Sequence, residues 1–195
     1  MTHASALPAA ALGLLGLIAA GPAPAAEYTI DPAHTQANFQ VDHLGFSTIW
    51  GRFDDEAGVI VFDPDNVEAS SVEIVIQTAS VDTNYDARDE DLRSPDFFNS
   101  AEFPEMTFKS TKVEKTGDNT GKVTGDLTFL GVTKPVTLDV EFNKVGSYPW
   151  DDSTEVVGFS ATTVIDRTAF GMTFMSGAIG DQIQVDIEVE ANRPL

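Results

Sequence analysis

The side chains that could do chemistry in this sequence are few, and two histidines come first. Histidine is a common metal ligand and general acid–base, and His34 and His43 follow the N-terminal segment. They are nine residues apart, and an odd spacing on one strand puts two side chains on opposite faces. A shared metal site would need a turn or bulge between them, so we predict neither a metal nor a cofactor.

Cysteine is absent from the chain. This excludes a disulfide scaffold, thiolate catalysis, and zinc or iron–sulfur sites held by thiolates. No G-x-S-x-G, H-E-x-x-H or Walker-type loop occurs either. We therefore predict no enzymatic activity.

The segment DTNYDARDEDLR has the beginning of a calcium-binding loop, with Asp82, Asn84 and Asp86 at positions one, three and five. Such a loop needs glycine at position six and a bidentate glutamate at position twelve. Ala87 and Arg93 occupy these two positions. We interpret the segment as turn and helix-capping chemistry.

Two adjacent pairs of opposite charge, Arg88-Asp89 and Asp166-Arg167, lie where predicted strands end. One interpretation is a surface or loop-anchoring ion pair, which contributes little on its own. The other is polar contact with the head group of a ligand.

Apolar side chains are the more numerous candidates for a binding site. Any one of them can be ordinary core, but the set is large for a single-layered β structure, and flexible methionines suit an adaptable apolar surface. Burying about ten methylenes of a lipid tail would contribute roughly 8 kcal/mol before association costs. The candidates are Phe39, Val41, Phe46, Phe53, Ile74, Ile76, Phe97, Phe98, Phe103, Met106, Phe108, Leu127, Phe129, Phe159, Phe170 and Met172.

Strands must position these side chains, because alternation of apolar and polar residues is the dominant pattern. In QIQVDIEVEA, for example, Ile183, Val185, Ile187 and Val189 share one face. One apolar face per strand and short connections favour an all-β fold, an eight-stranded antiparallel up-and-down barrel with a lipocalin-like interior. The predicted strands are 34–43, 47–62, 68–80, 104–115, 120–130, 133–144, 154–165 and 181–191.

Residues 81–103 interrupt this alternation. Residues 86–92 have the composition of a short helix, and Ser94-Pro95-Asp96 has the residues of a second helix start. We therefore predict two helical turns between strands three and four, which carry Phe97 and Phe98 to a mouth or seam of the barrel as an aromatic wall or lid.

The N-terminal segment differs from the rest. An uncharged apolar run, 9–20, is too short to span a membrane and precedes Ala23-Pro24-Ala25. This layout predicts a signal peptide at 1–25, cleaved after Ala25 or Ala26, and one domain at 27–195. The net charge of −20 argues against nucleic acid or anionic lipid surfaces as partners, and the mature chain contains no predicted membrane span.

Four long stretches resemble the YceI-like family of exported, lipocalin-like, polyisoprenoid-binding proteins. They are residues 28–53, 79–111, 125–142 and 158–172, in order and over nearly the whole mature chain. One departure is Asp91, which stands where the family usually has histidine in its R-D-x-H-L segment.

The resemblance implies an eight-stranded barrel that holds a long apolar chain, such as a polyprenyl, quinone-like or fatty-acid-derived molecule. Members of the family are often dimeric, and the predicted signal peptide indicates a periplasmic location. The residues carried over as pocket or pocket-supporting positions are His43, Arg88, Asp89, Phe97, Phe98, Phe103 and Phe108. A periplasmic lipid carrier is the main hypothesis. An enzyme acting on such a lipid, or a partner of a membrane quinone-using cytochrome, is the alternative.

Overall fold

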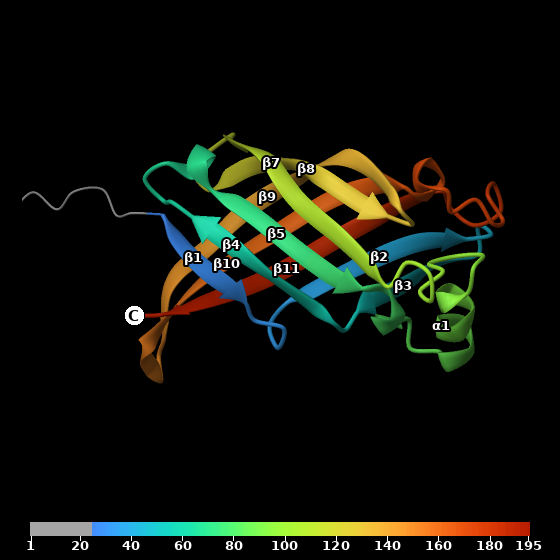
Figure 1. Cartoon of the computed structure of the whole chain (residues 1–195), viewed down its shortest axis with the longest axis horizontal. Helices are drawn as coiled ribbons and strands as arrows, with labels where there is room; N and C mark the ends of the chain where they lie inside the picture. Colours follow the sequence, from blue (N-terminus) through green and yellow to red (C-terminus); the bar gives the residue numbers. More distant parts are fainter. Residues whose placement is uncertain (1–24) are drawn as a thin grey trace, which may run out of the picture.

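A computed structural model describes residues 25–195 and shows a barrel of long antiparallel strands with one short helix at one end (Figure 1). The predicted signal peptide, apart from Ala25, lies outside the described residues. The strands are β1 (Ala26–Ile30), β2 (Gln36–His43), β3 (Ser47–Phe53), β4 (Glu56–Phe62), β5 (Ser71–Gln77), β6 (Val81–Asp82), β7 (Glu105–Lys115), β8 (Thr120–Phe129), β9 (Val132–Tyr148), β10 (Asp151–Asp166) and β11 (Gln182–Pro194).

Strand pairing closes the sheet into a barrel. The order runs β1-β4-β5-β7-β8-β9-β10-β11, and β11 pairs with β1 again. β2 lies along the other half of β11, through residues 184–188, and β3 pairs with β2. β1 and β2 together therefore act as one long strand with a break, and β3 and β4 together act as another. The chain forms a closed eight-stranded antiparallel barrel, which confirms the predicted fold.

The predicted strand over 47–62 is interrupted in the structure. The chain breaks between β3 and β4 at Asp54 and Asp55. The backbone N–H groups of both residues donate hydrogen bonds to the Ser80 hydroxyl oxygen, each at 3.1 Å. β1 was not predicted, because residues 31–35 form a turn that separates it from β2. β9 and β10 also run beyond their predicted ends and meet in a tight turn at Pro149 and Trp150.

The insert lies between β6 and β7, as predicted, and contains the helix α1 (Asp86–Arg93). No second helix begins at Ser94, so that part of the prediction is wrong. Ser94 instead caps the end of α1, where its N–H donates to the Asp91 carbonyl. Hydrogen bonds from Phe97 and Asn99 to the Ser94 carbonyl then fold the chain into turns, and Asn99 has a left-handed φ of 46°.

Inward-facing side chains form two packed clusters. The larger one extends toward the α1 end and includes Phe53, Phe98, Phe129 and Phe170. The smaller one, around Tyr28, Phe62 and Val157, is formed by residues of β1, β4, β10 and β11. No helix within residues 25–195 is long and apolar enough to cross a membrane.

Candidate functional site: an apolar cavity in the barrel

A cavity of about 350 Å³ remains inside the barrel between these clusters. Successive strand residues point to opposite faces, so each strand contributes every second side chain to the wall. Of the predicted site residues, eight line this cavity: Phe39, Phe53, Ile74, Ile76, Met106, Phe108, Leu127 and Phe159. The structure thus brings together aromatic and aliphatic side chains from β2, β3, β5, β7, β8 and β10.

Two glycines shape the cavity wall. A β-carbon on Gly51 would lie 2.3 Å from Cζ of Phe39, and one on Gly125 would lie 2.5 Å from Cζ of Phe108. The two phenylalanine rings therefore lie flat over backbone on the neighbouring strands. This arrangement leaves space at the centre of the barrel.

The wall includes further residues that the list of candidates omitted. Their signal was present in the alternating pattern, because most belong to apolar faces that the sequence displays clearly. Among them are Ile30, Ile60, Phe62, Val72, Val113, Val123, Val136, Leu138, Val140, Phe142, Ala161, Ile165, Val185, Ile187 and Val189.

Polar groups gather at one end of the cavity, which we call the mouth. The mouth is formed by the β4–β5 connection and the β7–β8 turn, which lie together at the end away from α1 (Figure 1). Lys115 supplies the cationic group there and Asp118 an anionic one. The other polar residues of the mouth are Ser70, Ser71, Asn119 and Thr120.

Four buried residues close the barrel toward α1, and we call them the plug: Phe98, Phe129, Phe170 and Met172. The Phe98 ring meets cavity residue Phe53 edge-on, with centroids 5.3 Å apart. Phe129 lies 5.7 Å from both Phe98 and Phe170, centroid to centroid. The plug packs against the cavity wall without lining the cavity, so its predicted contact with ligand stays a prediction.

The structure places the remaining apolar candidates outside the cavity. Val41 is half-buried on β2, and Phe46, at the β2–β3 turn, is 87% exposed. Phe97 packs edge-on against Phe174 at 5.3 Å. Phe103 is half-buried, and its carbonyl accepts a hydrogen bond from the Thr78 hydroxyl.

The polar candidates also lie away from the cavity. His43 is exposed at the end of β2, while His34 lies in the turn before β2 and bonds Asp31 at 2.8 Å. Hydrogen bonding to Asp31 raises the pKa of His34. Within residues 25–195 no group of three or more His, Cys, Asp or Glu side chains could hold a metal ion.

Arg88 and Asp89 form hydrogen bonds within the insert and not with each other. The buried Asp89 carboxylate accepts a hydrogen bond from the Thr83 N–H at 2.8 Å and another from the Thr83 hydroxyl. Arg88 donates to the hydroxyl and to the carbonyl of the same threonine, both at 2.7 Å. Of the two interpretations of this pair, the geometry favours loop anchoring.

Arg167 is an anchor of the same kind and does not bond its neighbour Asp166. Its guanidinium is 3% exposed and donates to four carbonyls, those of Met172, Phe174, Ile179 and Gly180, at 2.9–3.1 Å. It also pairs with Asp181 at 3.0 Å. Asp166 instead caps the next turn by accepting from Thr168, and these hydrogen bonds lower the pKa of Asp166.

Glu56 is a buried carboxylate that the sequence analysis did not identify as a candidate. One of its oxygens accepts the Ala37 N–H at 3.0 Å, and the other has no hydrogen-bond partner. Burial raises the pKa of Glu56, the bond from Ala37 acts in the opposite direction, and Asp54 and Asp55 raise it further. The strand alternation carried a signal, because Glu56 shares its face with Ile60 and Phe62.

Comparison with known proteins agrees with the sequence resemblance. The model of the YceI-like domain matches residues 28–191. The chain belongs to the YceI-like family. Among its relatives are a UPF0312 protein of Ectopseudomonas mendocina, 40% identical over 94% of this chain and 96% of the relative, and protein YceI of Escherichia coli, 42% identical over 89% and 91%.

Solved structures of similar fold include a YceI protein of Campylobacter jejuni, 38% identical with a TM-score of 0.67 over 78% of this chain and 89% of that one. BcnA of Burkholderia cenocepacia has a TM-score of 0.73 at 23% identity, over 83% and 99%. A polyisoprenoid-binding domain of Saccharophagus degradans has a TM-score of 0.65 at 18% identity, over 86% and 98%. The last two establish likeness of fold.

Proposed function

We propose that this YceI-like protein binds a long-chain lipid inside its barrel and acts as a carrier for it. The observation that carries the proposal is the cavity of about 350 Å³, walled by apolar side chains from the barrel strands. Its volume lies in the range of small-molecule sites, roughly 300–1,000 Å³. An isoprenoid, quinone-like or fatty-acid-derived chain has the long, mainly apolar shape that such an interior suits.

The polarity of the cavity suggests an orientation for the lipid. The tail would lie among Phe39, Phe53 and Ile76 and end against the plug, where no polar partner is needed. The head group would remain at the mouth, within reach of Lys115 and Asn119. Burying about ten methylenes at ~0.8 kcal/mol each gives roughly 8 kcal/mol before association costs, enough for reversible binding.

Location and assembly are part of the proposal. The apolar run and Ala23-Pro24-Ala25 support export through a cleaved signal peptide to the periplasm. N-terminal sequencing of the mature protein would test this. We also propose that the carrier can form homodimers, as the family resemblance implies, and light scattering on the purified protein would measure it.

Native mass spectrometry of the purified protein tests the carrier proposal directly. Ala161 is 7% exposed and lines the cavity, whereas its neighbour Thr162 is exposed on the outside of the same strand. We expect the parent and Thr162→Phe to carry a bound lipid, and Ala161→Phe to lose it by filling the space. A parent protein that never co-purifies lipid and does not take up farnesol, ubiquinone or oleate would contradict the proposal.

A further inference from the structure

The end of the barrel beside α1 carries an exposed apolar surface, which we call the tip. It consists of Leu44 and Phe46 from the β2–β3 turn and Phe174 and Met175 from the 171–181 loop. Phe46 is 87% exposed and the other three are 42–43% exposed. Both segments lie at the same end of the molecule, opposite the mouth (Figure 1).

The tip is held rigidly rather than left loose. Ile179 bridges His43, and the Gly180 N–H donates to the Asp42 carbonyl at 2.9 Å, so the two segments are joined. Arg167 binds four carbonyls of the 171–181 loop from inside. A loop fixed from beneath by a buried arginine keeps its apolar side chains on the outside.

Backbone conformation points the same way. Leu44 and Met175 have left-handed φ values of 59° and 49°. Such values are uncommon outside glycine, asparagine and aspartate, and asparagine before glycine is the usual choice in the turn that Leu44-Gly45 forms. The same left-handed pair occurs at Leu130-Gly131, where the leucine packs against the core, whereas Leu44 and Met175 hold this conformation with their side chains exposed.

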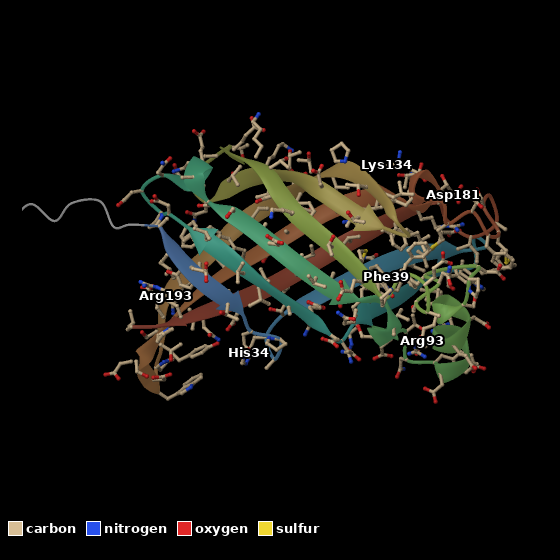
Figure 2. All side chains as sticks on the ribbon, in the orientation of Figure 1. His34, Phe39, Arg93, Lys134, Asp181 and Arg193 are labelled. Carbon is tan, nitrogen blue, oxygen red and sulfur yellow. The ribbon has the colours of Figure 1, made fainter. Side chains whose placement is uncertain are left out.

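Charge distinguishes the loop half of the tip, whereas the β2–β3 turn is preceded by the exposed Asp42 and His43. Residues 168–180, TAFGMTFMSGAIG, contain no charged side chain in a protein of net charge −20. Asp181, labelled at this end in Figure 2, is paired with Arg167 at 3.0 Å and also accepts from Ser176. The helix α1, on which Asp86 and Glu90 are exposed, lies at the same end of the barrel.

We propose that the tip docks reversibly onto the surface of an electrically neutral lipid bilayer. Backbone groups that enter a bilayer must be satisfied within the protein, and the β2–β3 turn satisfies two of its N–H groups. Its Phe46 N–H donates to His43 and its Gly45 N–H to the Asp42 carboxylate, while Arg167 satisfies carbonyls of the neighbouring loop. Phe46 is the most exposed of the four tip side chains and projects from the surface. The fluid interior of a bilayer can accept such a side chain without a complementary pocket.

A second copy of the chain fits the tip less well, because tip-to-tip contact would bring the two α1 helices, with their exposed Asp86 and Glu90, to one interface, where like charges repel; a homodimer would therefore use another surface. Docking at the tip leaves the mouth facing away from the bilayer and free. The inference therefore goes beyond the proposed carrier function and does not depend on what the cavity holds.

Flotation with phosphatidylcholine vesicles tests the proposal. We expect the full chain to float with the vesicles and Phe46→Ser/Met175→Ser to float at least about tenfold less, since full burial of one phenylalanine corresponds to about a tenfold effect or more. Phe46→Trp keeps a large aromatic side chain at this position and should float with the vesicles like the parent. The matched control is Trp150→Ser, which removes an 80% exposed aromatic from the β9–β10 turn at the opposite end and should float like the parent.

Several outcomes separate the possibilities. Adding phosphatidylglycerol should weaken flotation, because the acidic residues at this end of the barrel are repelled. Unchanged urea unfolding and unchanged co-purified lipid in the double variant would show that fold and cavity are intact. A parent that does not float, a double variant that floats equally well, or a dimer that dissociates only in the double variant would overturn the proposal, the last in favour of a second copy.

Discussion

Arg167 offers the sharpest test of how the closed end of the barrel is held. Replacing it by methionine keeps much of the side-chain volume and removes all its donors. Four carbonyls, those of Met172, Phe174, Ile179 and Gly180, would then lose their shared partner. The 171–181 loop contributes Met172 to the plug, so the effect should reach the core.

The magnitude follows from burial. Each hydrogen bond contributes about 1 kcal/mol net, and a buried acceptor left without a partner costs about 1–3 kcal/mol. Asp181 is 32% exposed, so its charge stays hydrated and its pairing adds little. Water entry would satisfy some carbonyls, and the loss of four hydrogen bonds leads us to expect that Arg167→Met lowers the free energy of unfolding by about 3–5 kcal/mol.

Urea unfolding followed by tryptophan fluorescence measures this change. Arg52→Met is the matched control, because Arg52 is 49% exposed and its ion pairs with Asp54 and Asp82 should contribute at most about 1 kcal/mol. Arg167→Lys should fall between parent and Arg167→Met, since an ammonium has three donors instead of five. A loss of less than about 1 kcal/mol in Arg167→Met would refute the view of Arg167 as the loop's anchor.

Three further predictions concern other parts of the barrel. Burial raises the pKa of Glu56 above the ordinary 4.5, so its contribution to stability is complete below that pH and is lost as pH rises. The free energy of unfolding of Glu56→Gln, measured in urea, should therefore rise relative to that of the parent as the pH increases from about 4 to about 8. An equal difference at both pH values would contradict this. Gly125→Ala places Cβ 2.6 Å from the Lys109 carbonyl and should cost about 1–3 kcal/mol; Gly158→Ala, with 3.9 Å of clearance, should be nearly neutral. A hydrogen bond to Glu190 raises the pKa of Tyr148 to about 12, so its stabilisation persists below pH 10.0 and disappears as pH rises toward 12. Absorbance titration of Tyr148→Phe should lack the latest phenolate transition, and its survival would assign that transition elsewhere.

The architecture could be predicted because alternation is a local property of the sequence. An apolar face every second residue fixes which side of each strand is buried, and short turns fix antiparallel neighbours. What alternation does not report is continuity. The break at Asp54 and Asp55 depends on a serine hydroxyl from Ser80, a contact between residues distant in sequence.

The site could be predicted only in part for a related reason. Phe39, Phe53 and Phe108 line the cavity, while the equally apolar Phe98, Phe129 and Phe170 fill the plug. Phe129 lies on β8, but Phe98 lies in the insert and Phe170 in the short turn after β10, both outside the alternating strands. Their burial depends on how these loops fold over the end of the barrel, which is set by contacts between residues distant in sequence.

The cavity also explains why the ends of this barrel are so firmly built. Side chains that line an unfilled centre have fewer packing partners than side chains in a filled core, and this barrel leaves about 350 Å³ unfilled. The closed ring, the plug and the Arg167 anchor must supply what the hollow centre does not. By the same reasoning Ala161→Phe, which fills the space, should bind lipid worse and resist urea better than the parent. A wide apolar centre that forgoes core packing is the physical argument for the proposed carrier function.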